Sequence, residues 1–471
     1  MFKLLLSIYN YTKLIYKVSS FYNLSLTKEI EEEDINTFVQ TIIPNITSCG
    51  CVCIKFSQWV TPILDALYNE IDKEPYWLKT LEKFYENCPD HSLEYTFSQY
   101  KIDFKEDFND TYELLDIIGS GSIGQVYKIK HRLTNKYYAM KIIHPNVHYD
   151  MWFFKIIITI LLRIPYTNRL IYNVLPYDIS KFISLFEEQL DMINESNNLC
   201  QMSENYKDNS MIIIPTILKC SHNILVMSYE DGVDIDNHDI SEYDKMKIIC
   251  LLYLFSRNNF EYKNFNHADL HKGNWKITKE NKLLIYDFGY CFKISNLNII
   301  THISNAFIDT DKQNGIYNLK MFFIELLNIT SDKDKLFIEE YIHTNLSEQI
   351  NKYMVDAAIL IPHIFSIAKQ LNIQLVPEFM QAMIVQIQNN KHITKYNINN
   401  KLQDFPTGEH IYRNNYLDYY TMCQTYDIFP EMQEYFKTIL NEKQVEVNEL
   451  FDTLDKTTYI TDDIKSLLKF D

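Results

Sequence analysis

The spacing of apolar residues changes about a quarter of the way along the chain, and the change separates segments of different predicted structure. Before it, residues 29–43 and 56–71 carry apolar side chains three or four positions apart, which is the spacing of one face of a helix. After it, residues 112–119 and 122–131 are short runs of β-branched and aromatic residues with glycines between them. The pattern therefore predicts a mostly helical region over residues 1–110, followed by a β-hairpin.

The middle of the chain mixes both patterns. Residues 136–144 predict a third strand, and a helical stretch follows over about 150–205 with a break at 164–176. Residues 211–220 and 223–230 then predict two more strands.

From about residue 238 onward the pattern is largely helical. A loop at 267–275 and a strand at 282–290 interrupt it, and amphipathic segments with aromatic residues fill 330–471. We expect these last helices to pack within the protein, with contact to a partner or a membrane as the less favoured alternative. A small β-rich unit followed by a larger helical unit predicts an α+β fold.

Composition narrows the classes of partner. A formal net charge of −17 argues against nucleic acid, because phosphate binding requires a basic surface. Nine cysteines without paired spacing predict reduced thiols in an intracellular compartment. Cys49, Cys51 and Cys53 alternate, but no second Cys or His cluster lies nearby, so thiols are favoured over a zinc site.

Two apolar segments bear on membranes. Residues 1–20 lack a small-residue cleavage site and arginine, which does not support a signal peptide. A packed helix is the favoured interpretation there, and peripheral membrane contact is the alternative. Residues 151–166 contain Lys155 and Arg163 and are too short and too charged for a membrane span, so we expect a buried helix. The sequence does not identify the compartment further.

The turn of the predicted hairpin has the pattern G-x-G-x-x-G-x-V. Glycines allow such a turn to lie close over phosphate groups, and a lysine on the third strand commonly binds those phosphates. Here Lys141 follows Ala139 on that strand, so we expect the lysine to hold ATP phosphates and the alanine to face adenine. An ordinary exposed strand lysine is the alternative. The predicted nucleotide loop comprises Gly119, Ser120, Gly121, Ser122, Ile123, Gly124 and Val126.

A buried lysine needs an opposite charge to stay protonated and oriented. Glu195, on the helical segment 185–199, is the best candidate partner for Lys141, although a solvated helical glutamate is the simpler alternative. The strand over 223–230 would supply the adenine hinge, with Met227 and Tyr229 lining the base.

Residues 267–274 contain the pattern H-x-D-x-x-x-x-N. Asp269 can accept a proton from a hydroxyl or orient a water, while Asn274 can bind a metal ion. Asp287 then begins a D-F-G tripeptide at the end of a predicted strand, where a carboxylate would bind Mg²⁺ bridging the phosphates. The ordered set indicates a site for ATP and Mg²⁺. No A-P-E segment follows, which weakens a peptide-phosphorylating role.

Several segments resemble a particular family. The runs SIGQVYKI, MKIIHPNV and ADLHKGNW resemble motifs of the UbiB/aarF-domain (ABC1-type) family of atypical kinases. IKFSQW resembles the family's K-x-G-Q motif, and QLDMINESNNL resembles its E-x-D helix. Together the resemblance covers about residues 55–290, roughly half of the chain.

The resemblance implies a protein-kinase-like two-lobe fold whose N-terminal extension covers the site where a protein substrate would bind. Lys55, Gln58 and Asp191 would then be the extension residues that form this lid. ATPase activity is better supported in that family than protein phosphorylation, and the family is implicated in coenzyme Q biosynthesis and lipid homeostasis. The implied division is residues 1–110 as the extension, 111–235 as an N-lobe with inserted helices, and 236–471 as the helical C-lobe.

The sequence departs from the family at three positions. The alanine-rich loop is Gly119–Ser122 here, the glycine of K-x-G-Q is Ser57, and the first acid of E-x-D is Gln189. Lys55 then loses the charged partner expected at that position, which predicts a looser lid.

The leading hypothesis is therefore an ATP- and Mg²⁺-dependent UbiB-like kinase or ATPase. Its acceptor would be an unidentified lipid, small molecule or protein. A protein Ser/Thr kinase and a nucleotide-binding pseudokinase scaffold are the alternatives.

Overall fold

The computed structural model describes residues 2–68, 75–86, 90–174, 176, 178–207, 209–308, 312–347, 357–376 and 378–385. The helices predicted for the last part of the chain, beyond residue 385, lie outside these ranges.

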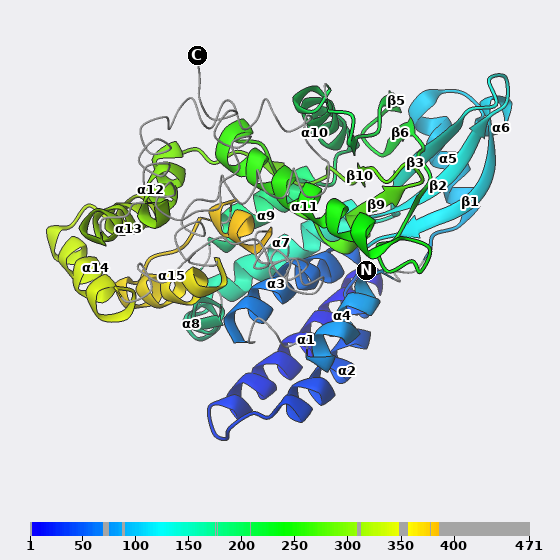
Figure 1. Ribbon diagram of the computed structural model, residues 1–471. Helices are drawn as coiled ribbons and strands as arrows, with labels where there is room; N and C mark the ends of the chain where they lie inside the picture. The colour runs from blue at the N-terminus through cyan, green and yellow to red at the C-terminus, as the bar shows by residue number, and fades with distance from the viewer. Residues whose placement is uncertain are drawn as a thin grey trace, which may run out of the picture.

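Helices dominate the chain before the first strand, as predicted. α1 and α2 run side by side and extend from the body of the molecule, while α3 enters it (Figure 1). These described helices are α1 (Phe2–Ser25), α2 (Glu32–Ser48), α3 (Cys51–Tyr68), α4 (Tyr76–Glu86), α5 (Leu93–Phe104) and α6 (Phe108–Thr111).

The junction of α2 and α3 determines where α3 meets the rest of the protein. Gly50 links them with φ of +99°, a conformation that L side chains rarely adopt. A Cβ on Gly50 would also collide with the carboxylate of Asp150 on α7 (Val147–Arg163). Cys49 and Cys53 lie buried at this junction as free thiols. The close approach of α3 to α7 fixes the start of α3, the helix that carries Lys55.

A five-stranded antiparallel sheet follows, in the order β1-β2-β3-β6-β5. The predicted hairpin and third strand are confirmed within it. The strands are β1 (Tyr112–Ser120), β2 (Gly124–His131), β3 (Tyr137–Ile143), β5 (Ile217–Cys220) and β6 (Ile224–Ser228).

Side chains alternate along a strand, so the two faces of this sheet pack against different parts of the protein. On β3, Met140 and Ile142 pack into a small aromatic core with Tyr100 of α5 and Phe108 of α6. Ala139, between Met140 and Tyr138, points to the opposite face and joins the main core of the protein. Lys141 shares the face of Ala139, so the sheet directs it into the space between the lobes.

Four helices connect β3 to the next strands: α7, α8 (Pro165–Val174), α9 (Ile179–Glu188) and α10 (Met192–Asn205). The break predicted over residues 164–176 is wrong for most of that length. Among the described residues of this range, Ile164 and Pro176 lie outside helices, and α8 begins immediately at Pro165. Proline is well suited to the first position of a helix because the N–H that it lacks has no intrahelical partner there.

α7 was predicted as a buried helix, and one of its faces is buried through Met151, Phe153, Phe154 and Ile158. Its other face is open, with Trp152 52% exposed. No helix within the described residues is long and apolar enough to cross a membrane.

The single strand predicted over residues 211–220 is wrong. Pro215 divides this segment into β4 (Ile212–Ile213) and β5, and the two belong to different sheets. Proline has no N–H to donate to a strand ladder, so it ends the pairing between them.

The second lobe holds the remaining strands and most of its residues are helical. β4, β10, β9 and β7 form a four-stranded sheet, and β11 pairs with β8. The strand predicted over 282–290 is shorter in the structure and ends before Asp287. These strands are β7 (Gly232–Val233), β8 (Asn266–His267), β9 (Trp275–Thr278), β10 (Leu283–Ile285) and β11 (Cys291–Phe292).

The helices of this lobe begin near the centre of Figure 1 and continue to the side away from β1–β3. They are α11 (Glu242–Asn258), α12 (Leu297–Ile308), α13 (Lys312–Leu326), α14 (Asp332–Asn345) and α15 (Ala357–Leu371), and residues 378–385 are also helical. A β-rich lobe, a larger helical lobe and an N-terminal helical extension confirm the predicted α+β, protein-kinase-like two-lobe class.

Candidate active site

Lys141 is the centre of the polar cluster between the lobes. Its Nζ lies 2.9 Å from both carboxylate oxygens of Glu195 and 2.7 Å from Oδ1 of Asp287. Glu195 comes from α10 and Asp287 from the segment after β10, so three distant parts of the chain converge here. The Glu195 side chain is only 1% exposed and that of Lys141 11%. The structure therefore brings together the lysine, glutamate and aspartate that the sequence singled out.

The charges of this cluster support one another. Burial disfavours the charged form of Lys141, but Asp287 and Glu195 outweigh it and hold its pKa above the ordinary value. Burial raises the pKa of Glu195 to about 6, and Lys141 opposes the increase. For Asp287, burial would raise the pKa, but Lys141 and then Lys55 lower it well below its usual range. At neutral pH Lys141 is thus a cation and Asp287 an anion.

The glycine-rich turn joins β1 to β2 above this cluster. Gly121 N–H donates to the carbonyl of Gly124 at 2.9 Å, which closes the turn. A Cβ on Gly124 would lie 2.6 Å from the carbonyl oxygen of Ile142, so only glycine fits against β3 at this position. Ser122 is buried, and within the described part of the chain Ser120 has a buried hydroxyl without a hydrogen-bond partner.

Two histidines support the turn from below. His144 N–H donates to the carbonyl of Ile123 at 2.8 Å, and the His144 ring contacts the carbonyl of Gly121 at 3.0 Å. The Nδ1 atoms of His144 and His91 are 2.7 Å apart. Burial lowers the pKa of both rings, that of His91 to about 4. Neither histidine was singled out from the sequence, although His144 belongs to the run MKIIHPNV.

The predicted adenine residues lie on neighbouring strands. Ala139 of β3 is directly opposite Met227 of β6, and both side chains are buried. Val126 of β2 is opposite Lys141. Tyr229 lies just beyond β6, where Lys128 Nζ is 4.0 Å from the centre of its ring.

The loop after β8 is held by its own hydrogen bonds. The N–H of Asp269 donates to Nδ1 of His267 at 3.2 Å. The side-chain amide of Asn274 donates to the carbonyl of Asp269 at 2.7 Å. This bond uses the nitrogen end of the Asn274 amide, so its oxygen is the end that could bind a metal ion.

Asp287 has a left-handed backbone, with φ of +62°. Such a conformation is uncommon for a residue other than glycine, and backbone strain of this kind is concentrated at functional sites. The neighbouring Phe288 is fully buried, with its ring 5.2 Å from that of His267. The aspartate is thus held in an unusual conformation by a buried neighbour.

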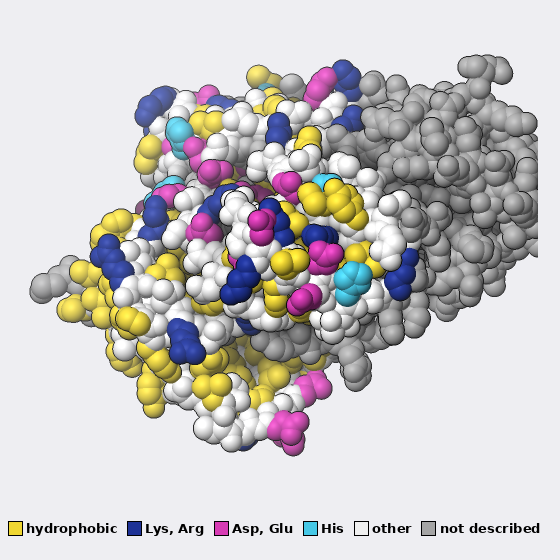
Figure 2. Space-filling model, turned by 90° about the vertical axis from the view of Figure 1, so that its left-hand side faces the viewer, with side chains coloured by type: hydrophobic (Ala, Val, Ile, Leu, Met, Phe, Trp, Pro, Cys, Tyr) yellow, Lys and Arg dark blue, Asp and Glu magenta, His cyan; other side chains and the backbone are white. Residues whose placement is uncertain are grey.

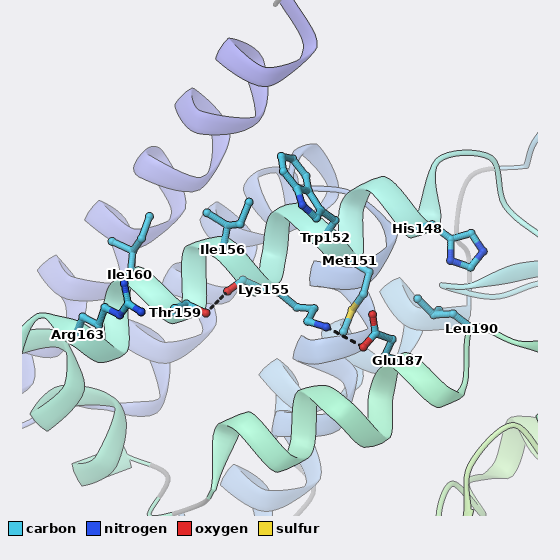
Figure 3. Close-up of a pocket in the computed structure, with 10 residues that line it drawn as sticks. All are labelled: His148, Met151, Trp152, Lys155, Ile156, Thr159, Ile160, Arg163, Glu187 and Leu190. Carbon is cyan, nitrogen blue, oxygen red and sulfur yellow. Dashed lines mark hydrogen bonds and ion pairs between the residues drawn. The ribbon is translucent and has the colours of Figure 1, made fainter.

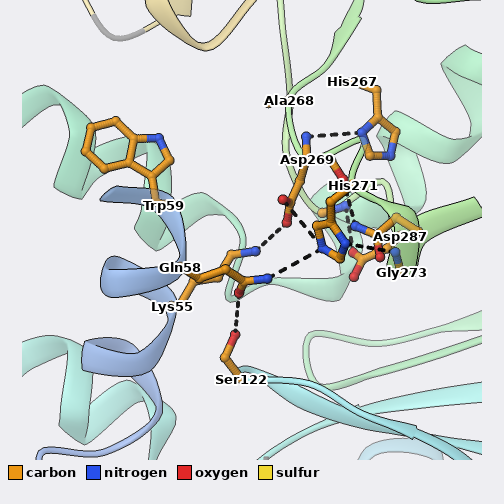
Figure 4. A network of polar contacts seen from close by, with 12 residues as sticks. Lys55, Gln58, Trp59, Ser122, His267, Ala268, Asp269, His271, Gly273 and Asp287 are labelled. Atoms are coloured by element: carbon orange, nitrogen blue, oxygen red, sulfur yellow. Dashed lines mark hydrogen bonds and ion pairs between the residues drawn. The ribbon is translucent and has the colours of Figure 1, made fainter. Parts of the chain in front are cut away.

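The extension reaches the site through α3, as Figure 4 shows. Lys55 Nζ is 2.5 Å from Oδ2 of Asp269. Gln58 Nε2 is 3.5 Å from Nε2 of His271, and the Ser122 hydroxyl donates to Gln58 Oε1 at 3.4 Å. α3 therefore contacts the glycine-rich turn and the loop after β8 at once.

This geometry corrects one expectation about Lys55. The replacement of an acid by Gln189 was expected to leave Lys55 without its charged partner, but Asp269 takes that place. Burial would raise the pKa of Asp269, and Lys55, followed by His271, lowers it below its usual range.

Asp191 is not brought to this cluster. Its carboxylate caps α10 by accepting the N–H of Ile193 at 2.9 Å, and it also lies 3.0 Å from the exposed His222. Aspartate is among the preferred residues at this helix position. Among the described residues no contact joins Asp191 to the glycine-rich turn or to the loop after β8, whereas its bond to the N–H of Ile193 supports a capping role.

A separate cavity of about 500 Å³ lies between α7 and α9 (Figure 3). The Lys155–Glu187 ion pair crosses it at 2.7 Å, and apolar side chains of α7 form much of its wall. None of the residues predicted to bind nucleotide lines this cavity. It is a different place on the molecule from the polar cluster around Lys141.

Comparison with known proteins agrees with the geometry of the polar cluster. Residues 83–317, about half of the chain, match the ABC1 atypical kinase-like domain. The chain belongs to this ABC1 family. The matched range contains the glycine-rich turn, Lys141, Glu195, Asp269 and Asp287, while Lys55 and α3 lie before it.

Relatives in the ABC1 family are distant. A probable serine/threonine-protein kinase, abkC, of Dictyostelium discoideum is 28% identical over 255 residues, which are 50% of this chain and 34% of that protein. An MCP2 homologue of Schizosaccharomyces pombe is 27% identical over 252 residues, covering 50% and 42%. A probable protein kinase UbiB of Histophilus somni is 24% identical over 242 residues, covering 48% and 42%. The chain thus matches less than half the length of each of these relatives.

Among solved structures, the Rv3197–erythromycin complex from Mycobacterium tuberculosis is similar with a TM-score of 0.43 and 15% identity. The match covers 71% of this chain and 87% of that chain. A similarity at this level supports no argument about function.

Proposed function

We propose that this ABC1-family chain binds ATP with Mg²⁺ between its lobes and cleaves the terminal phosphate bond. The observation that carries the proposal is the convergence of Lys141, Glu195 and Asp287 beneath the glycine-rich turn. A cation held by two carboxylates can release one of them to a metal ion and turn toward phosphate oxygens without losing its charge.

The residues present fit this ligand. Lys141 would hold phosphates, and Ser120, whose buried hydroxyl has no hydrogen-bond partner within the described residues, could donate to one. Asn274 and Asp287 offer the amide and carboxylate oxygens that Mg²⁺ prefers. When bound, Mg²⁺ would neutralise the charge of the phosphates. Ala139 and Met227 offer an apolar surface for adenine.

Asp269 would receive the proton of the attacking hydroxyl or orient a water. Its carboxylate is paired with Lys55, and Gln58 lies beside the same loop. A protein side chain must reach Asp269 to be phosphorylated, and α3 occupies that approach. We therefore favour hydrolysis, or transfer to a small or lipid acceptor, over phosphorylation of a protein. A link to lipid or quinone metabolism rests on the family resemblance.

One set of measurements separates the candidate activities. We expect magnesium-dependent ATP turnover by the wild type, and Asp269→Asn should bind ATP normally but lose turnover by about 100-fold or more. Labelled phosphate appearing on protein in trans would favour a protein kinase instead. ATP binding without turnover in the wild type would favour a pseudokinase scaffold. Asp332→Asn, at an exposed carboxylate on α14, is the control that should change nothing.

We also propose that an anionic membrane surface is a partner of the extension. Residues 1–28 contain four lysines and no acidic residue, in a chain of net charge −17. α1 exposes large apolar side chains, with Leu5 58% and Tyr9 63% exposed. Apolar side chains gather in the lower left of the described surface in Figure 2. A helix that is both basic and apolar suits the surface of an anionic bilayer.

Sedimentation with vesicles tests this contact. We expect binding to vesicles containing phosphatidylserine and little binding to neutral phosphatidylcholine vesicles. The double variant Leu5→Glu/Tyr9→Glu should lose that binding. Leu133→Glu, which changes an apolar residue in the β2–β3 turn that is even more exposed, at 88%, should keep it. Equal sedimentation of the double variant and the wild type would contradict the proposal.

A further inference from the structure

A buried glutamine links the extension to the loop that carries Asp269. Gln381 lies in the helical segment 378–385, and its Nε2 donates to the carbonyl of Ala268 at 2.5 Å. Its Oε1 accepts the indole N–H of Trp59 at 2.7 Å. Each end of the amide thus binds a distant part of the chain. Trp59 lies 322 residues from Gln381 along the sequence, and Ala268 lies 113 residues from it.

The surroundings make a polar residue at this position unusual. Apart from Gln381, all of residues 379–385 have apolar side chains that are buried in the main core. Gln381 itself is only 7% exposed. A buried amide is costly unless its hydrogen bonds are made, and an apolar residue would fill the core without that cost. The two bonds of Gln381 are therefore what distinguishes this residue from its neighbours.

The hydrogen bonds of Gln381 connect α3 to the loop that carries Asp269, and the ion pair between Lys55 and Asp269 connects the same two segments directly. Lys55 and Trp59 are four residues apart on α3, so they lie on the same face of the helix. Lys55 holds the carboxylate of Asp269, and Trp59 holds the preceding residue through Gln381. The N–H of Ala268 also donates to the carbonyl of Tyr290, so the peptide backbone before Asp269 is held on both sides.

The two contacts behave differently during a reaction. The ion pair to Lys55 competes with any hydroxyl or water that approaches Asp269, so it must open for turnover. The bridge through Gln381 is uncharged, contacts only the backbone of the loop and need not open. We propose that Gln381 is a positioning residue that ties α3 to the backbone of the catalytic loop and keeps Asp269 in place when Lys55 withdraws.

The expected effect of Gln381 on ATP turnover rests on the proposed function. Its expected effect on the order of the loop does not. Two readouts follow from that difference. Gln381→Leu should accelerate amide hydrogen exchange over residues 266–270 about five- to tenfold, since one net hydrogen bond to the loop is lost. It should lower kcat about tenfold and leave ATP affinity within about twofold, because Lys141 and Asp287 do not contact Gln381.

Two further variants make the result specific. Trp59→Phe removes the indole N–H at the α3 end of the bridge and should give a smaller effect of the same kind. Tyr100→Phe removes the hydrogen bonds of a buried hydroxyl to Glu106 and Lys219 in the small core of the first lobe, far along the chain from the loop, and controls for general loss of stability. It should leave exchange over residues 266–270 at the wild-type rate.

The outcomes are distinct. Faster exchange in the loop together with lower kcat and unchanged ATP affinity supports the inference. Wild-type exchange in Gln381→Leu, a kcat no lower than that of Tyr100→Phe, or a Trp59→Phe variant identical to the wild type in both readouts overturns it. If the wild type turns over no ATP while Gln381→Leu still loosens the loop, the proposed function fails and the positioning contact stands.

Discussion

The ion pair between Lys55 and Asp269 leads to a prediction about turnover. Lys55→Met keeps most of the length and the apolar part of the side chain but removes its charge. If α3 restrains the site as proposed, this variant should turn over ATP faster than the wild type, because Asp269 no longer has to leave a bound cation.

The structure bounds the size of the effect. The two charged atoms are 2.5 Å apart, and the side chains of Lys55 and Asp269 are 14% and 24% exposed. Coulomb attraction at that distance in a medium of effective dielectric about 20 is at most about 7 kcal/mol. Loss of hydration offsets most of it, and a pair between the surface and buried extremes contributes about 1–3 kcal/mol net. Since about 1.4 kcal/mol corresponds to a tenfold change in rate, turnover should rise about 5- to 150-fold.

Steady-state ATP hydrolysis at saturating Mg²⁺ measures this directly. Lys335→Met, which removes the lysine of an exposed ion pair on α14, is the matched control and should stay within about twofold. A second signature is the pH profile. Lys55 lowers the pKa of Asp269, so the acid limb of turnover should move to higher pH in Lys55→Met. Slower turnover in this variant would refute the reasoning, because it would mean that Lys55 assists the reaction.

Two further predictions concern the buried ionisable groups. Glu195→Gln leaves Lys141 with Asp287 as its charged partner and should lower the free energy of unfolding by about 2–4 kcal/mol in urea titrations; an unchanged value would contradict the pairing. The pair His91–His144 should make the protein less stable in acid. Both folded-state pKa values are lowered, so only the unfolded chain takes up protons as pH falls from about 6.5 toward 4, and stability present above pH 6.5 is lost there. For the partly buried His91 the loss at pH 5 should be about 1 kcal/mol, and His91→Gln should remove it; an identical pH dependence in that variant would count against this account.

The motifs allowed much of the fold and the site to be anticipated, because they encode local requirements. The glycine-rich turn needs Gly124 where β2 presses on Ile142, and a lysine on β3 two residues beyond Ala139 must share its face. These constraints act over a few residues, so they are visible in one sequence. The α+β class and the order of the lobes followed from the same short-range patterns.

Errors in the secondary structure arose at prolines. Pro165 was interpreted as part of a break, yet it opens α8, and Pro215 was included in a strand that it divides. A proline at the first position of a helix and a proline inside a strand have opposite consequences, and the surrounding apolar residues are similar in both cases.

The long-range contacts of the extension could not be predicted. Lys55 was compared with an acid near residue 189, whereas its partner in the structure, Asp269, is 214 residues away in the loop after β8. Asp191 fits both a lid and a helix cap in the sequence, and only its bond to the N–H of Ile193 distinguishes them. Gln381 carries no motif, so its two hydrogen bonds appear only when the chain is folded.

The central claim is that Asp287, Lys141 and Glu195 form a site for ATP with Mg²⁺. Calorimetric titration of ATP into the protein, with and without Mg²⁺, tests it most directly when wild type and Asp287→Asn are compared. The account predicts magnesium-dependent binding by the wild type and a loss of at least about tenfold in affinity in the variant, since the metal loses a charged ligand. ATP binding of equal strength in both proteins, or no binding by the wild type with Mg²⁺ present, would contradict the claim.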